Sequence, residues 1–220
     1  MAVTPEHFNR RSFIYPRLIE AGAEFTDVVD AAVAARYPHD APALGLVDLS
    51  PMPRTGVKGP GALEWLAAQG WPVPEDNNQA AHTESGGMVL RLGNREAFVL
   101  PAPRGDGETV HTLEQSIPGD GVWHMPRRDS HAWFLLRGEA GVDCMAKLCG
   151  VDLREAQFPR GAIAQTSVAR LNTIVCRDMA GATPGFHLLA DSASAIWFWD
   201  ALLDAMQEFD GGPLGIHEID

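Results

Sequence analysis

Two short stretches of the sequence share one pattern, which constrains the fold more than any other feature. The first, from Val57 to Leu66, reads VKGPGALEWL, and the second, from Leu136 to Met145, reads LRGEAGVDCM. In each, an apolar and a basic residue lead into a glycine, and a run with helical spacing follows. The pattern predicts a strand, a tight turn and a helix, written twice. The two copies lie further apart than the roughly 20 to 50 residues of a solenoid repeat, which indicates a duplicated subdomain.

The glycines of the first copy raise the question of a phosphate-binding loop. Gly56, Gly59 and Gly61 lie close together between an expected strand and an expected helix. A nucleotide loop needs G-x-x-x-x-G-K-[ST], or G-x-G-x-x-G between strand and helix, and neither spacing is present. The glycines are therefore interpreted as a strand-to-helix corner, with Pro60 suited to the start of the helix.

The remaining pattern repeats the same order of elements in both parts of the chain. Alternating or continuous apolar runs predict strands, and helical spacing predicts helices. Strands are expected at 44–50, 55–58, on both sides of Gly93–Asn94, and at 131–137, 162–168, 169–177 and 185–190; helices are expected from Ala62, at 109–116, at 140–149 and at 192–209. Each part then approximates strand, helix, two strands, helix, so the expected fold class is α+β with antiparallel sheet and helices on one side.

The domain organisation follows from this duplication. We expect a first half at 41–118 and a second half at 119–220, joined in one compact unit. Residues 1–40 are expected to form a helical lead-in. Phe25, Val28, Val29, Ala32 and Val33 lie there at helical spacing.

Composition excludes several classes of protein. The chain has 220 residues, 45% of them hydrophobic, and a net charge of -12, which argues against a nucleic-acid-binding surface. No uninterrupted apolar segment approaches the roughly 18 residues of a membrane span, and the N-terminus has no signal-peptide core. The three cysteines, Cys144, Cys149 and Cys176, are expected to be reduced thiols in a cytoplasmic protein.

The sequence predicts no catalytic residue and no metal site. Asp129, Ser130 and His131 are adjacent, but neighbours on an extended segment point to opposite sides and cannot form a triad. No G-x-S-x-G or H-x-x-x-H pattern occurs. His187 alternates with apolar neighbours, so it is either a half-buried sheet residue or a ligand contact.

The last expected helix carries Trp197, Phe198 and Trp199 in succession. Three consecutive aromatic residues cover most of a helix circumference, so they cannot all face one core. One interpretation is an interface with another subunit or a ligand. The other is a helix enclosed between sheet and loop.

Several short motifs, taken in order, resemble the aminomethyltransferase T-proteins of glycine cleavage. These motifs are Arg11–Ser12, Gly22–Ala23–Glu24–Phe25, Gly45–Leu46–Val47–Asp48–Leu49–Ser50, the VKGPGA segment, Gly86–Gly87 and Gly185–Phe186–His187–Leu188. The resemblance implies a folate-binding domain of two similar α+β halves. It also implies tetrahydrofolate as a cofactor and one-carbon transfer as the chemistry.

The chain departs from that family at the positions where the transferases have their catalytic residues. In the transferases the glycine pair leads into an aspartate pair, whereas Met88 and Val89 follow it here. The family's T-G-x-T-G-E segment would fall in 165–171, which lacks the glutamate, and we expect no C-terminal barrel of the kind that full-length transferases carry. By the same resemblance a folate pocket would be lined by Met88, Arg91 and His187.

A non-catalytic member of the superfamily resembles the chain more fully. The segment from Phe158 to Gly161, followed by Gln165 to Ala169, is similar to the gamma subunit of heterotetrameric sarcosine oxidase. This resemblance implies a subunit of an N-methyl amine oxidase or demethylase, with flavin-containing partner subunits and no flavin or metal bound by this chain. The alternative is a stand-alone tetrahydrofolate-dependent aminomethyltransferase-like or folate-binding protein.

Overall fold

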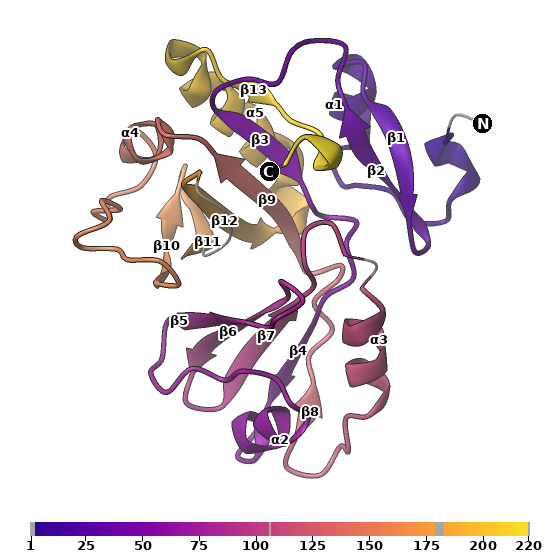
Figure 1. Ribbon diagram of the computed structural model, residues 1–220, viewed down its shortest axis with the longest axis vertical. Helices are drawn as coiled ribbons and strands as arrows, with labels where there is room; N and C mark the ends of the chain where they lie inside the picture. Colours follow the sequence, from indigo (N-terminus) through magenta and orange to yellow (C-terminus); the bar gives the residue numbers. More distant parts are fainter. Residues whose placement is uncertain (1–2, 106, 179–182, 220) are drawn as a thin grey trace.

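A computed structural model describes residues 3–105, 107–178 and 183–219, which form several sheets and few helices (Figure 1). The strands are β1 (Glu24–Val28), β2 (Ala31–Arg36), β3 (Gly45–Asp48), β4 (Thr55–Lys58), β5 (Gln79–His82), β6 (Met88–Gly93), β7 (Glu96–Leu100), β8 (Trp123–His124), β9 (His131–Arg137), β10 (Ile163–Val168), β11 (Leu171–Arg177), β12 (Gly185–Asp191) and β13 (Gly212–Pro213). The helices are α1 (Tyr15–Glu20), α2 (Ala62–Ala68), α3 (Glu108–Gln115), α4 (Gly141–Ala146) and α5 (Ala195–Met206), with 3₁₀ turns η1 (Pro5–His7), η2 (Ser192–Ser194), η3 (Gln207–Phe209) and η4 (Ile216–Glu218). The fold class is α+β, as the sequence predicts.

The two large sheets have the same internal order. One is five-stranded, β5-β6-β7-β4-β8, and the other is six-stranded, β10-β11-β12-β9-β3-β13. Apart from the parallel pair β13–β3, all their strand pairs are antiparallel. Position by position, β5 corresponds to β10, β6 to β11, β7 to β12, β4 to β9 and β8 to β3.

The correspondence includes a reciprocal exchange of strands. β3 precedes β4 in the chain, yet it pairs with β9 in the other sheet. β8 precedes β9, yet it pairs with β4. The leading strand of each copy therefore pairs into the sheet that the other copy builds: β8 lies at the edge of one sheet, and β3 lies between β9 and the short strand β13 in the other (Figure 1).

The two glycine corners have the same geometry. Gly59 follows β4 with φ 143°, and Gly138 follows β9 with φ 145°. A Cβ atom at either position would come within 3.0 Å of backbone, at Gly121 and at Ala43 respectively. Both positions therefore require glycine, both for the positive φ and for the close approach of another chain segment.

Three groups of buried apolar side chains make up the core. The first fills the space between the six-stranded sheet and α5, and the third lies between the five-stranded sheet and the helices α2 and α3. The second lies between the two sheets, and we call it the inter-sheet layer. Strand alternation explains the division, because successive side chains of one strand contribute to opposite layers.

The helical prediction for the lead-in is wrong from Phe25 to Val33. Residues 1–40 contain the helix α1, but the segment after it is the antiparallel hairpin β1–β2, in which Val28 pairs with Ala31. Residues 31–35 are buried throughout. A strand covered on both faces shows no period of two, so its apolar run fits a helical spacing by chance.

The hairpin predicted at Gly93–Asn94 is confirmed as β6–β7, although its turn differs from the expectation. Neither Gly93 nor Asn94 has a positive φ, and the register shifts between Arg91 and Gly93. The left-handed pair lies instead in the β10–β11 turn, at Ala169 and Arg170.

Candidate functional site

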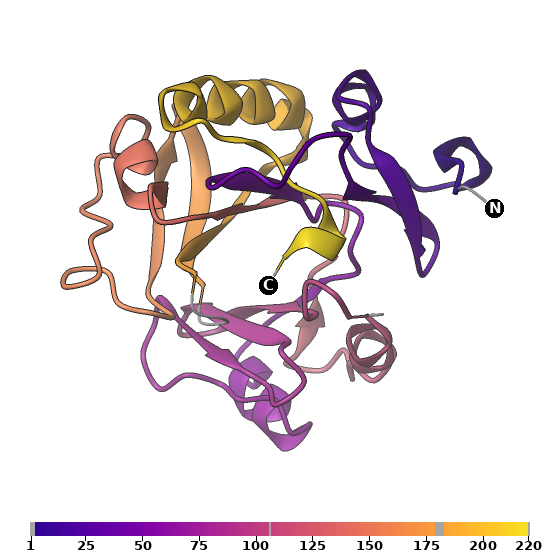
Figure 2. The same ribbon diagram turned by 45° about the horizontal axis from the view of Figure 1, so that its top comes forward.

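The inter-sheet layer is where the resemblance would place a ligand, and it is filled by the chain's own side chains. Both sheets contribute, for example Leu90 and Phe98 from one and Trp133 and Leu135 from the other. The C-terminal segment adds Leu214, Ile216 and Ile219 to the same layer. Figure 2 shows η4 lying over the space that the two sheets enclose.

Two of the three predicted folate-pocket residues face this layer, and one does not. Met88 belongs to the layer and is 1% exposed. His187 is fully buried and contacts Trp133 of the same layer. Arg91 lies an odd number of residues from Met88 on β6, and its side chain points the other way. It donates to the carbonyl of Pro74 at 2.8 Å and to the Asn77 side chain at 3.1 Å.

His187 is part of a buried polar chain that satisfies both ring nitrogens. Trp133 Nε1 donates to His187 Nδ1 at 3.1 Å, which leaves the proton on Nε2. His187 Nε2 lies 3.4 Å from Asp178 Oδ1, and Arg137 Nη1 lies 3.4 Å from Asp178 Oδ2. The half-buried sheet position expected for His187 is in fact wholly buried, because both faces of β12 are covered.

The tetrahydrofolate implied by the resemblance does not fit these residues as they stand. Met88 and His187 are enclosed by packed side chains, and Arg91 points to the 74–77 loop. His187 has no free ring nitrogen with which to meet a ligand. The three residues therefore form no common pocket in the described part of the chain.

Sequence reasoning missed an arginine that holds the strand crossing together. Arg54 is 2% exposed, and its guanidinium donates to the carbonyl of Ser50 at 2.8 Å and to that of Arg128 at 2.8 Å. It also donates to the carbonyls of Met52, Arg127 and His131. Burial lowers the pKa of Arg54 to about 9. The sequence signal at this position is the pair Pro51 and Pro53 just before it, which marks an irregular segment rather than a buried charge.

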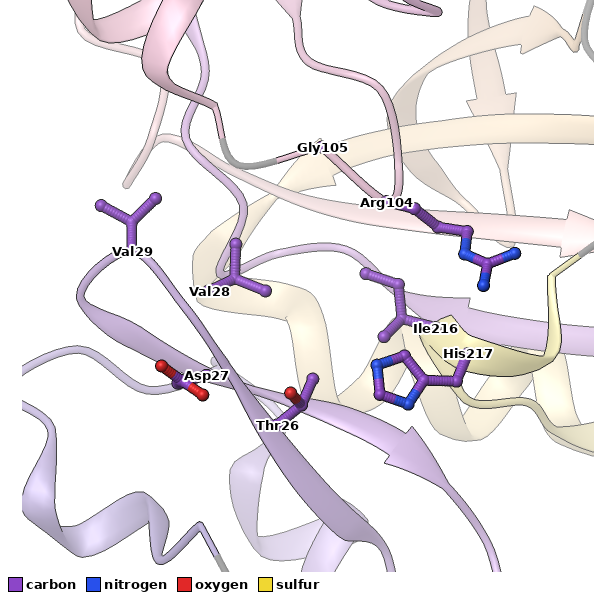
Figure 3. A pocket seen from close by; sticks show the side chains of 8 residues that line it. All are labelled: Thr26, Asp27, Val28, Val29, Arg104, Gly105, Ile216 and His217. Atoms are coloured by element: carbon purple, nitrogen blue, oxygen red, sulfur yellow. The ribbon is translucent and has the colours of Figure 1, made fainter.

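A cavity of about 410 Å³ lies between β1, η4 and the loop after β7 (Figure 3). Asp27 and Thr26 line it from β1, and Arg104 and His217 line it from the other elements. Arg104 Nη1 donates to the carbonyl of Ile219 at 3.0 Å, so it ties the C-terminal segment to the loop. This cavity could not be predicted from the sequence, because its walls are far apart in the chain.

The three aromatic residues of α5 have different environments. Phe198 and Trp199 are buried and contact Phe134 of β9, with ring centroids 5.7 Å and 5.2 Å away. Trp197 is 50% exposed beside Ile196, which is 40% exposed. Of the aromatic triplet, only Trp197 is available to a partner.

The described residues offer neither a metal-ion site nor a membrane-spanning helix. Within 3–105, 107–178 and 183–219, no group of three or more His, Cys, Asp or Glu side chains is arranged to hold a metal ion. Over the same ranges, no helix has both the length and the apolar character needed to span a bilayer. Cys144, Cys149 and Cys176 are free and buried.

Comparison with known proteins places the fold. No family model matches the sequence. The chain is 26% identical over 230 residues to an aminomethyltransferase of Parafrankia sp., covering 94% of this chain, and 26% identical over 211 residues to one of Mycobacterium avium, covering 90%. It spans only 61% and 55% of the lengths of these relatives.

Solved structures give the same fold. The aminomethyltransferase T of the Bartonella henselae glycine cleavage system superposes with a TM-score of 0.72 at 16% identity, over 95% of this chain and 60% of that one. A chain of the heterotetrameric sarcosine oxidase of Corynebacterium sp. U-96 superposes with a TM-score of 0.69 at 21% identity, over 93% of this chain and 98% of that one. The resemblance to the T-protein superfamily predicted from the sequence is confirmed.

Proposed function

We propose that this chain is a non-catalytic subunit of a multi-subunit amine oxidase or demethylase of the sarcosine oxidase type, in the position of the gamma subunit. The observation that carries the proposal is the end-to-end superposition on one chain of a heterotetrameric sarcosine oxidase, which covers 98% of that chain. The aminomethyltransferase matches cover 55% to 61% of their relatives.

The interior of the molecule supports a structural role. The part of the layer around Met88 and His187 is filled by apolar side chains, and the buried histidine there is hydrogen-bonded at both ring nitrogens. A general acid or base needs a nitrogen that can reach a substrate, which this arrangement does not supply. In the proposed complex, flavin and amine chemistry belong to partner subunits in the cytoplasm.

The test is assembly with flavin-containing subunits. The chain is co-expressed with each flavin-binding oxidase subunit encoded beside it, and the purified product is examined by native mass spectrometry and flavin absorbance. A stoichiometric complex containing flavin is expected. A chain that stays free of every such subunit contradicts the proposal.

Trp197 gives this experiment a matched pair of variants. Trp197→Arg places a charge on the exposed face of α5, and Ile19→Arg places one on α1, where Ile19 is 47% exposed. We expect the first to weaken the complex at least tenfold and the second to leave it unchanged, with both chains folded by circular dichroism. Equal effects of the two variants would show that α5 is not the contact.

Binding of tetrahydrofolate by the chain alone is the second candidate, because the curated relatives are aminomethyltransferases. Isothermal calorimetry with tetrahydrofolate distinguishes the two roles. Saturable heat from the isolated chain would favour the folate-binding role. Absence of heat and of thermal stabilisation at millimolar ligand would exclude it.

A further inference from the structure

One end of the inter-sheet layer opens into a cavity of about 390 Å³. Its apolar walls are Leu92 and Phe98 from the five-stranded sheet and Ile174 from the six-stranded sheet. Glu96 lies on the same face of β7 as Phe98, and Asn172 lies on the same face of β11 as Ile174, by the period of two. A volume of this size lies within the roughly 300 to 1,000 Å³ typical of small-molecule sites.

Arg127 crosses this cavity with its hydrogen-bonding capacity only partly used. Its side chain is 12% exposed, its Nη2 donates to Glu96 Oε1 at 2.6 Å, and its guanidinium carbon lies 4.2 Å from the Phe98 ring centre. Among the described residues, Nε and Nη1 have no hydrogen-bond acceptor, and Nε is shielded from solvent. A guanidinium has five N–H donors, and leaving the buried Nε donor unmatched is costly, while Nη1 is left with no acceptor among the described residues.

The local charge favours an anion. Glu96 is shared between Arg127 and Lys58, whose Nζ lies 2.9 Å from Glu96 Oε2. One carboxylate thus faces two cations, which leaves a net positive charge here on a chain of net charge -12. A planar carboxylate matches the fork of an arginine better than a point anion does.

His131 adds an acceptor to the same wall. Ser130 Oγ donates to the Arg127 carbonyl at 3.2 Å, so it accepts from His131 Nδ1, which lies 2.8 Å away. The proton is then on Nδ1, and Nε2 carries the lone pair. The ring stands edge-on to Phe98, with centroids 5.3 Å apart, so its orientation is fixed.

We infer that this cavity binds a small organic monocarboxylate, whose carboxylate pairs with the unused donors of Arg127 and whose apolar part lies against Leu92, Phe98 and Ile174. The occupant is the size of a single substituted ring or a branched chain. The site lies within one chain, so the inference does not depend on the proposed subunit role.

Benzoate is the probe, and benzamide is its uncharged counterpart of the same shape. Titration of the full chain is followed by isothermal calorimetry and by two-dimensional ¹H–¹⁵N spectra. Saturable binding of one benzoate is expected, with benzamide at least tenfold weaker and shifts centred on the ends of β7 and β11. No saturation by benzoate at millimolar concentration, or equal binding of benzamide, would overturn the inference.

Three variants locate the site. Arg127→Met removes the anion partner and is expected to abolish binding. Asn172→Trp fills the cavity from the exposed end of β11 without changing Arg127, so it gives the same result even if Arg127→Met fails to fold. Arg170→Met removes an exposed cation in the turn of the same hairpin, outside the cavity lining, and is expected to bind as the unaltered chain does. Benzoate affinity unchanged in Asn172→Trp would refute the location.

Discussion

The two halves of this molecule share an order of strands, but among the described residues large buried aromatic side chains from a helix pack against only one of the two sheets. Sheet order and corner geometry correspond, with φ of 143° at Gly59 and 145° at Gly138. The second half buries Phe198 and Trp199 of the 12-residue helix α5 against its sheet, whereas the first half is covered by the shorter helices α2 and α3. The shared topology therefore depends on a few backbone positions, such as the two glycine corners. The side chains that pack on the two sheets can differ between the halves.

The glycine corners give the largest expected effect. Gly138→Ala and Gly59→Ala each introduce a Cβ closer than 3.0 Å to backbone at positive φ, and each is expected to cost about 4 kcal/mol of unfolding free energy. Gly70→Ala is the control, since Gly70 has φ +84° but no atom within 4 Å of its Cβ, and it should cost about 1 kcal/mol. Urea unfolding measures all three. If Gly138→Ala were as stable as Gly70→Ala, the corner at Gly138 would not require glycine, and the two corners would not be equivalent.

The unequal cores are tested by truncating one side chain in each. Phe198→Ala is expected to lose about 4 kcal/mol, and Leu66→Ala on α2 about 3 kcal/mol, from lost transfer energy and the remaining cavity. Both should lower one common thermal transition, because the inter-sheet layer joins the halves. Calorimetry that resolves two transitions in Leu66→Ala would show that the halves unfold separately.

The buried His187 and the half-buried His131 differ in their partners, and the surroundings of His131 predict a pH dependence. His187 contacts the Asp178 carboxylate, whereas His131 lies beside cations. Burial, with the charge of Arg127, lowers the pKa of His131 to about 4 from its ordinary 6.5. The unfolded chain takes up the proton first as pH falls, so stability should decrease between pH 6.5 and 4, by about 1 to 2 kcal/mol for this partly exposed group, and level off below.

His131→Gln should flatten that part of the pH profile, measured as urea midpoints from pH 4 to 7. The exposed His39→Gln is the control and should leave the slope unchanged. A slope that survives His131→Gln would assign the titration to another group.

The smallest expected effect concerns the N-terminal ends of the helices α5 and α3, which cover the two sheets. Asp191 accepts a hydrogen bond from the backbone N–H of Ala193 at 2.8 Å and caps the turn before α5, while α3 begins after Gly107, which has no capping side chain. Asp191→Ala should cost about 1 kcal/mol and Asp191→Asn much less. Thermal unfolding measures both. Equal losses in the two variants would mean that the carboxylate acts through its charge.

Local features of the fold were predictable because their causes are local. The glycine corners, the β6–β7 hairpin and the helix α5 follow from turn residues and apolar periods in short windows. The strand exchange could not be predicted, because nothing in the sequence of β3 indicates that it pairs with β9 rather than with β4. The hairpin at 24–36 was mistaken because burial on both faces erases the period.

The candidate site was predicted less well, for a related reason. Alternation from Met88 would have placed Arg91 on the opposite face of β6, so that error could have been avoided from the sequence. The partner of His187, by contrast, could not be predicted from the sequence. Asp178 is a single acidic residue after a strand, and only the fold brings it close to His187. Arg127 likewise gave no signal, because its environment comes from two sheets.

The exchange of β3 and β8 makes the halves mutually dependent in a way that a cut chain would reveal. Cleavage between residues 117 and 121 would leave two fragments, each missing a strand that the other holds: β8 at the edge of one sheet, and β3 between β9 and β13 in the other. Neither fragment is expected to be stable alone, and mixing them should restore the fold by complementation. By the same topology, two intact chains at high concentration can each complete the other's sheet, so an intertwined dimer is the natural off-pathway product of refolding.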